Sequence, residues 1–147
     1  MDESFIIFED KNIKLRIPKQ LRFKHGTSYF FSGVLKRGQK DARVTLAIGL
    51  DPPFGGRKAA KKVILGALPN QEWMGVEMRT IRKGRCSFGD GGIEVLGKYT
   101  NPITVLYRWT VLYRLNKHHV YIDLGGGGNL DSFEKMGTDI IKSIVVK

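Results

Sequence analysis

The chain has 147 residues, a single cysteine and a formal net charge of +11 at pH 7. This length predicts one domain, residues 1–147, whose core needs neither a disulfide nor a metal to be stable. No apolar run reaches the length of a membrane span, and the acidic start, Met1-Asp2-Glu3-Ser4, lacks the basic and then apolar pattern of a signal peptide. We therefore expect a cytoplasmic protein without membrane insertion, although a secreted protein that has lost its signal would show the same start.

The positive charge is concentrated in one region of the chain. Residues 1–10 carry a net charge of −4, residues 11–85 carry +14, and residues 86–147 carry +1. Such a field favours an anionic partner, which could be a nucleic acid, an acidic protein or an anionic lipid surface.

Four strands are expected in the first third of the chain. The apolar run Phe5 to Phe8 is followed by a polar turn and then by Ile13 to Ile17, where apolar and basic residues alternate. This pattern predicts a hairpin ended by Pro18. We expect this hairpin at the front edge of the sheet. Two further strands are expected at Tyr29 to Leu35 and at Ala42 to Leu50.

A helix is expected next, over Arg57 to Leu68. Its apolar residues recur at helical spacing, and Pro69 follows its end. The segment Trp73 to Lys83 is expected to be extended, and a turn-rich link then leads into a strand at Ile93 to Tyr99.

The last third predicts a hairpin followed by a helix. Residues Val105 to Leu115 alternate like a strand and place Tyr107, Trp109 and Tyr113 on one face, which we expect to be core. A partner strand ends at Leu124, and the glycine run Gly125–Gly128 predicts a flexible loop.

The closing helix is predicted by apolar residues spaced three and four apart, with Asn129 or Asp131 as its cap. Those apolar residues are Leu130, Phe133, Gly137, Ile140, Ile141 and Ile144. Together the elements predict an α+β fold, a largely antiparallel sheet flanked by helices.

The order of elements resembles the PsbP-like fold. The similar features are Leu15-Arg16-Ile17-Pro18 at the end of the first hairpin, one helix after the fourth strand, the last hairpin, and the ending Ile140-Ile141-Lys142-Ser143-Ile144. This group includes a photosystem subunit, the Ran-release factors, and bacterial DcrB-type proteins, among them chaperones and accessory proteins of type VI secretion. The resemblance implies an α/β/α sandwich that acts as a non-enzymatic binding scaffold.

Three basic clusters are candidates for partner binding. The first lies on the expected helix, the second follows Glu77, and the third lies in the turn after the third strand. Their residues are Arg57, Lys58, Lys61 and Lys62; Arg79, Arg82, Lys83 and Arg85; and Lys36 and Arg37. If the clusters converge, they form a face for an acidic protein or for nucleic acid; if they scatter, they only keep the protein soluble.

Catalysis, cofactors and metals find little support in the sequence. No Lys-Ser or Lys-Thr pair follows Gly125–Gly128, so this run is not a phosphate loop. A lone cysteine such as Cys86 is usually buried and inert. His118 and His119 point to opposite faces of a strand and cannot chelate one metal together.

We therefore expect a non-enzymatic accessory protein that binds one acidic partner. The preferred hypothesis is a cytoplasmic immunity protein that occludes a cognate bacterial toxin or effector. An effector chaperone of a secretion system and a basic nucleic-acid-binding module are the alternatives. The oligomeric state is left open.

Overall fold

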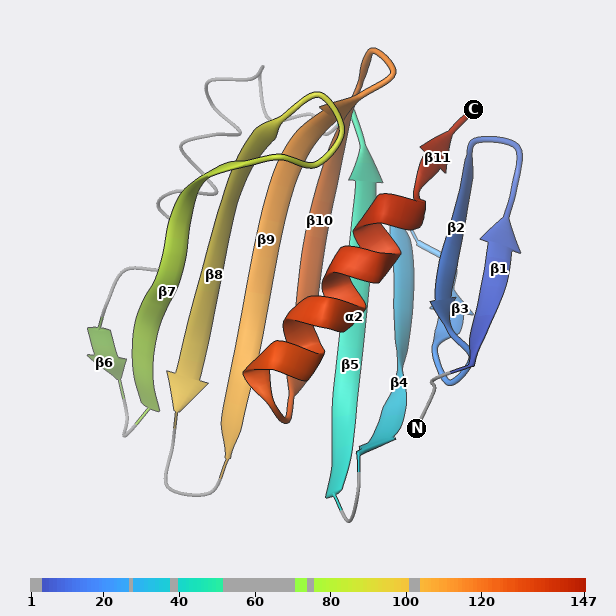
Figure 1. Cartoon of the computed structure of the whole chain (residues 1–147). Coiled ribbons are helices and arrows are strands. Elements are labelled where there is room, and N and C mark those ends of the chain that lie inside the picture. The colour runs from blue at the N-terminus through green and yellow to red at the C-terminus, as the bar shows by residue number, and fades with distance from the viewer. Residues whose placement is uncertain (1–3, 27, 38–39, 52–70, 74–75, 101–103) are drawn as a thin grey trace.

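The computed structural model describes residues 4–26, 28–37, 40–51, 71–73, 76–100 and 104–147. These residues form two antiparallel sheets and one helix, α2 (Leu130–Ser143) (Figure 1). The first strands are β1 (Phe5–Glu9), β2 (Ile13–Pro18), β3 (Arg22–Lys24), β4 (Tyr29–Arg37), β5 (Lys40–Leu50) and β6 (Gln71–Trp73). The later strands are β7 (Val76–Cys86), β8 (Gly92–Thr100), β9 (Val105–Leu115), β10 (His118–Gly127) and β11 (Val145–Val146).

The larger sheet has eight strands in the order β3-β4-β5-β10-β9-β8-β7-β6. Every pairing in it is antiparallel, as the short connections of the sequence predict. The tight turn between β9 and β10 uses Asn116 and Lys117, both at positive φ (49° and 69°). Two such residues in succession are typical of the two-residue hairpin turns whose twist matches that of the strands.

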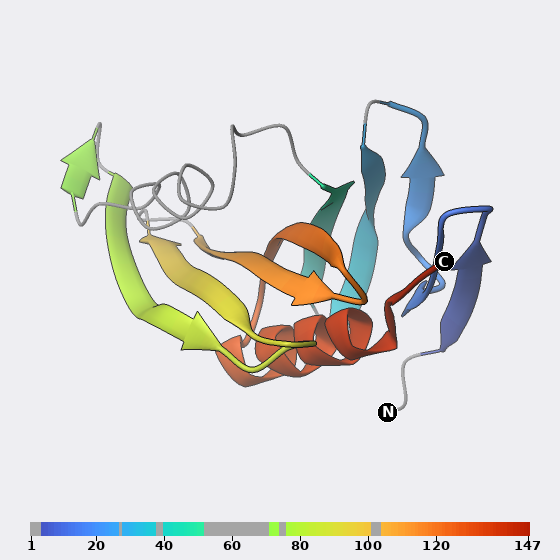
Figure 2. The same cartoon turned by 90° about the horizontal axis from the view of Figure 1, so that it is seen from above.

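Helix α2 lies across one face of this sheet (Figure 2). The side chain of Asn129 accepts a hydrogen bond from the backbone N–H of Ser132 at 3.1 Å, so Asn129 is the N-cap. The apolar stripe of the helix faces the sheet, where Phe133, Ile140 and Ile141 are buried. The predicted helix and its cap are thus confirmed.

The predicted core face of β9 is also confirmed. Tyr107, Trp109, Val111 and Tyr113 are all buried in the main hydrophobic cluster, with the buried side chains of α2. A smaller cluster of Ile93, Val95 and Leu112 is buried separately. Because these residues alternate with the core residues of β8 and β9, the smaller cluster lies on the other face of the sheet.

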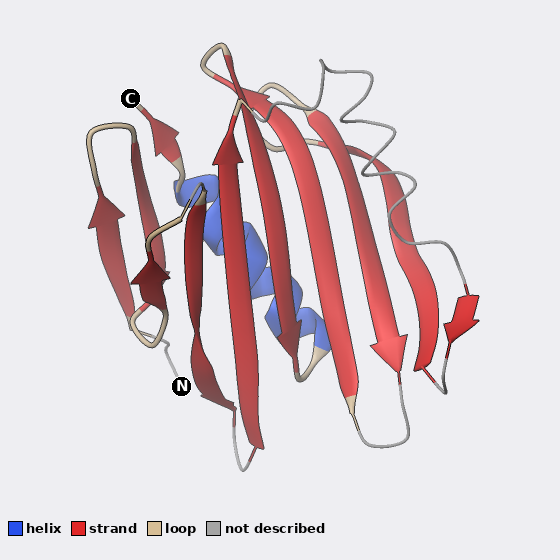
Figure 3. Ribbon diagram, turned by 180° about the vertical axis from the view of Figure 1, so that it is seen from behind, coloured by secondary structure: helices blue, strands red, loops and turns tan. Residues whose placement is uncertain are grey.

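The first hairpin is placed differently from our expectation. Strands β1 and β2 do not form the edge of the eight-stranded sheet; they form a separate three-stranded sheet in the order β1-β2-β11 (Figure 3). The side of β2 away from β1 is occupied by β11, which pairs with Lys14 and Ile13. The edge of the large sheet is instead the short strand β3, which the sequence analysis missed.

The glycine run is also not the predicted loop, because Gly125, Gly126 and Gly127 continue strand β10. Gly126 is buried, and a Cβ atom there would lie 3.3 Å from the ring of Phe133 on α2. Because glycine has no side chain, the first turns of the helix can approach the strand closely here, which explains a glycine within a strand. Only Gly128, with φ of 94°, lies in the turn itself.

The coarse fold class is confirmed as a mostly antiparallel sheet with a C-terminal helix. The expected sheet with helices on both sides is not what the described residues show, since α2 is the one helix among them. The other predicted helix, Arg57 to Leu68, falls outside the described residues. Within the described ranges no helix is long and apolar enough to span a membrane.

Candidate protein-binding surface

The four predicted partner-binding cations of β7 lie on two different faces of the sheet. A register shift between Thr80 and Arg82 interrupts the pairing of β7 with β8. Beyond it Arg82 is opposite Leu96, a core residue under α2. Lys83 is opposite Val95, which belongs to the smaller cluster on the other face. Since cross-strand partners share a face, the strand divides these cations and does not gather them.

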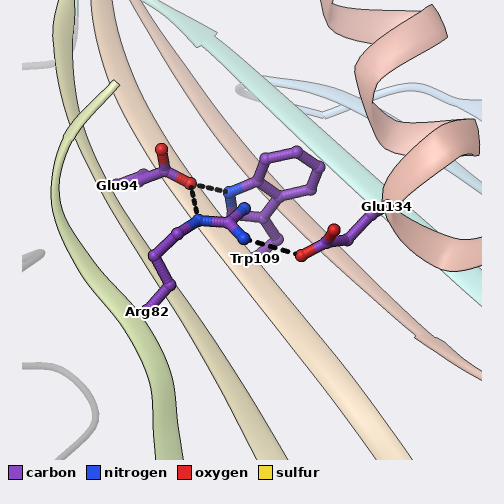
Figure 4. Close-up of polar contacts among 4 residues, drawn as sticks. All are labelled: Arg82, Glu94, Trp109 and Glu134. Atoms are coloured by element: carbon purple, nitrogen blue, oxygen red, sulfur yellow. Dashed lines mark hydrogen bonds and ion pairs between the residues drawn. The ribbon is translucent and has the colours of Figure 1, made fainter. Parts of the chain in front are cut away.

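On the face covered by α2, the two arginines already have carboxylate partners. Arg79 forms an ion pair with Glu77. Arg82 lies between Glu94 and Glu134, with donor-to-acceptor distances of 3.0 Å and 2.8 Å (Figure 4). On the other face, Lys83 and Arg85 are exposed, and no carboxylate of the described residues pairs with either.

The Arg82 cluster fastens helix α2 to the sheet. Glu94 is only 7% exposed, and its Oε1 accepts hydrogen bonds from Arg82 and from the indole N–H of Trp109, the latter at 3.0 Å. The guanidinium of Arg82 also lies 5.5 Å from the centre of the Trp109 ring. Burial opposes the charge of Arg82, but its hydrogen bonds to Glu134 and Glu94 outweigh that cost and raise its pKa. We interpret this cluster as structural.

The remaining predicted cations lie outside the part of the chain whose side chains the structure describes. The described residues do not include Arg57, Lys58, Lys61 and Lys62. The backbone of Lys36 and Arg37 belongs to β4, but their side chains are not described. The second cluster does not lie on one face, and a role of these cations in partner binding stays a prediction.

A groove that the sequence analysis missed lies between the small sheet and the end of α2. It encloses about 510 Å³ and is lined on the apolar side by Phe5, Ile7 and Val145. Ile7 is 60% exposed and Val145 is 54% exposed, the two highest values among the exposed large apolar residues of the described chain. The groove therefore has an apolar floor that faces solvent.

Cations lie beside these apolar residues, because β2 is the central strand between β1 and β11. Lys14 and Arg16 project from β2 and Lys142 from the last turn of α2, while Asp139 is the one acidic residue of the lining. The guanidinium of Arg16 lies 5.1 Å from the centre of the Phe5 ring, so it reaches across β1. The site combines an exposed apolar surface with an excess of positive charge.

The geometry of the groove depends on contacts between the two ends of the chain. The backbone N–H of Arg16 donates to the hydroxyl of Ser143 at 2.9 Å, which closes the edge of β2 next to its pairing with β11. The alternation of Lys14 and Arg16 with buried Ile13 and Leu15 showed that the cations point outward. Nothing in the sequence placed them beside α2, since Arg16 and Ser143 are 127 positions apart.

A second hollow of about 550 Å³ contains the histidine that the sequence analysis considered as a metal ligand. His118 Nδ1 lies 2.8 Å from Asp51 Oδ2, and the other oxygen of Asp51 accepts from the backbone N–H of His119. The His118 hydrogen bond is the main cause that lowers the pKa of Asp51. Among the described residues no three His, Cys, Asp or Glu side chains come together to hold a metal. We interpret the pair as a tie between the end of β5 and the β9–β10 hairpin.

Cys86 is expected to react slowly with alkylating reagents. Burial is the main cause that raises the pKa of its thiol, so less thiolate is present at a given pH than in a solvated cysteine. At pH 8 we expect iodoacetamide to modify Cys86 several times more slowly than it modifies cysteine in a short peptide. A faster reaction than in the peptide, followed by mass spectrometry, would instead indicate an activated nucleophile.

The architecture just described is the Mog1p/PsbP-like fold, so the resemblance of the sequence to PsbP-like proteins is confirmed at the level of fold. Neither a family model nor a curated protein matches the sequence.

Among the solved structures that match, two share the fold over nearly the whole chain. One is the Ran-binding protein Mog1p of Saccharomyces cerevisiae, with a TM-score of 0.57, 10% sequence identity, and coverage of 99% of this chain and 96% of that chain. The other is LpqN, involved in cell envelope biogenesis of Mycobacterium tuberculosis, with a TM-score of 0.54, 12% identity, and coverage of 99% and 91%. At these identities the likeness concerns the fold alone.

Proposed function

We propose that this protein is a non-enzymatic binding protein whose partner is an acidic protein that docks in the groove between the small sheet and α2. The observation that carries the proposal is that three cations, Lys14, Arg16 and Lys142, line the same groove as the exposed apolar residues of β1 and β11. A partner segment that offers carboxylates beside one or two apolar side chains would complement both parts of the groove.

The two kinds of residue would contribute differently to binding. The cations and the net charge of +11 would speed the encounter with an acidic partner and disfavour a basic one. Most of the affinity would come from desolvation of the apolar floor, because a few central apolar or arginine anchors usually dominate an interface. Arg16 belongs to both groups, since it stacks on Phe5.

The fold agrees with a role in protein binding. Mog1p, which shares it, is a Ran-binding protein. Within this proposal we retain the finer hypothesis of a cytoplasmic immunity protein, which would silence a toxin or effector by covering an acidic surface of it. An effector chaperone would use the same groove but would also be needed for the stability of its partner.

The test is affinity capture from a lysate of the cells that express the protein. The native protein and the double variant Arg16→Glu/Lys142→Glu are used as baits, with and without nuclease, and bound proteins are identified by mass spectrometry. We expect one acidic protein that is retained by the native bait after nuclease treatment and reduced at least tenfold on the variant.

Other outcomes would contradict the proposal. Nucleic acid on the native bait, with all proteins lost after nuclease treatment, would favour the nucleic-acid alternative. A partner retained equally by the two baits would show that the groove is not its binding site. Far-ultraviolet circular dichroism checks that the variant is folded, since a carboxylate in the last turn of α2 costs some helix stability.

A further inference from the structure

Strand β1 forms an edge of the small sheet. It pairs along its whole length with β2 and, within the described part of the chain, with no strand on its other side. Figure 1 shows it as the outermost strand beside β2. Its residues Phe5 and Ile7 line the groove. An edge of this kind presents a row of backbone donors and acceptors to solvent.

The direction of these backbone groups follows from two hydrogen bonds at the ends of the hairpin. The backbone N–H of Asp10 donates to the carbonyl of Ile13, and the carbonyl of Ser4 accepts from the backbone N–H of Lys19, each at 3.0 Å. Because successive residues of a strand direct their backbone groups to alternate sides, the even-numbered residues of β1 face β2. The residues whose N–H and C=O groups face away from β2 are Phe5, Ile7 and Glu9.

The same alternation holds on β2, which supports this assignment. Its residue Arg16 is paired with Ile7 and directs its N–H away from β1, to the hydroxyl of Ser143. That edge of β2 is closed by Ser143 and β11. The outer edge of β1 is therefore the open one.

This edge lacks the usual protection against pairing with another strand. Proteins commonly place lysine, proline or a bulge on an exposed edge. The sequence of β1 is Phe-Ile-Ile-Phe-Glu, without any of these, and Ile6 and Ile7 are 43% and 60% exposed. Its one charged residue, Glu9, lies at the end and pairs with Lys147. An apolar, unprotected edge beside the candidate groove has the features that peptide-binding proteins use to pair with an added strand.

We propose that the acidic partner binds as an extended segment that adds a strand to the open edge of β1. Alternate side chains of the added strand would lie beside Phe5 and Ile7 on the groove side. A carboxylate there would be within reach of Arg16, whose guanidinium already extends over Phe5. A second copy of this chain is a poorer occupant, since its own net charge of +11 opposes self-association. This inference rests on the proposed function of the groove and adds the backbone conformation of its ligand.

The test uses a defined probe, a short peptide of alternating glutamate and valine, with the matching lysine–valine peptide as its control. Amide hydrogen exchange of the labelled protein is followed by NMR at saturating peptide. We expect exchange to slow at least tenfold at Phe5, Ile7 and Glu9 with the acidic peptide only. Ile6 and Phe8, which already face β2, serve as internal controls and should change little.

A backbone variant gives an independent readout. Ile7→Pro removes one outward N–H and leaves the groups of Ile6 and Phe8 that face β2, so protection of these two amides shows that the hairpin is intact. We expect Ile7→Pro to weaken binding of the acidic peptide at least tenfold, and Ile7→Val to keep it within about threefold.

The outcomes separate this inference from the proposed function. Acidic-peptide binding that is lost in Arg16→Glu/Lys142→Glu, but without slowed exchange at the three outward amides, would overturn strand addition and leave the groove as the binding site. Failure of the acidic peptide to bind, or equal binding of the basic peptide, would contradict both.

Discussion

Replacing Gly137 with valine is expected to lower the free energy of unfolding by about 3 kcal/mol. Gly137 lies in the middle of α2 where the helix crosses the sheet. A Cβ atom there would lie 2.8 Å from both Leu124 Cδ2 and Trp109 Cζ3, closer than real Cβ contacts. Both neighbours are buried, so the valine could be accommodated only if the helix moved away from the sheet.

The control for this change is Lys135→Val on the exposed side of the same helix. It introduces the same side chain without a packing conflict and should cost less than about 0.5 kcal/mol. Urea unfolding of the two variants gives the comparison. If Gly137→Val were as stable as the native protein, or more stable because a helical glycine had been removed, the close approach of α2 to the sheet would be wrong.

Replacing Glu94 with alanine is expected to lower the free energy of unfolding by about 2–3 kcal/mol. Glu94 is buried, and its carboxylate accepts hydrogen bonds from both Arg82 and Trp109. Without it, the indole N–H of Trp109, a residue only 3% exposed, would be buried without an acceptor. Arg82 would keep Glu134 but lose its buried partner.

The matched control is Glu134→Ala, which removes the other carboxylate of Arg82. The side chain of Glu134 is 31% exposed, so its ion pair is partly screened by solvent and is expected to contribute less than about 1 kcal/mol. Thermal or urea unfolding of both variants checks the order. Equal losses would mean that the network does not depend on the buried carboxylate.

Local patterns were sufficient to predict the central part of the fold. The alternation of apolar residues from Val105 to Leu115 and the helical spacing from Leu130 to Ile144 correctly predicted β9, α2 and the face that each buries. These signals are strong because both elements are long: the helix keeps one apolar face over several turns, and the strand keeps its alternation over several residue pairs. Of the two caps that the sequence offered, Asn129 and Asp131, the structure uses Asn129.

The features that were missed depend on contacts between distant segments. The two-residue strand β11 carries no periodic signal, yet its pairing with β2 separates the first hairpin from the large sheet. The close approach of Phe133 to Gly126 explains why a glycine run belongs to a strand. Alternation along β7 could not assign its cations to faces, because the register shift before Arg82 is invisible in the sequence.

The same reason explains why the candidate groove was not found in the sequence. The sequence pattern did indicate that the cations of the groove, on β2 and in the last turn of α2, point to solvent. The apolar residues Phe5 and Ile7 of its floor belong to the first hairpin, which the sequence predicts at the edge of the large sheet. Tertiary contacts bring the two parts together, among them the Arg16–Ser143 hydrogen bond and the pairing of β2 with β11.

The most direct test of the central claim compares two double charge reversals, one in the groove and one on a different surface. Arg16→Glu/Lys142→Glu alters the groove, and Lys83→Glu/Arg85→Glu alters exposed cations of β7 on the sheet face away from α2. Both variants change the net charge equally, so non-specific attraction falls by the same amount.

The measurement is the Kd of each variant for the captured acidic partner, determined by surface plasmon resonance. We predict that the groove variant binds at least tenfold more weakly and that the β7 variant stays within about threefold of the native protein. The opposite order would place the binding surface on β7 and contradict the account.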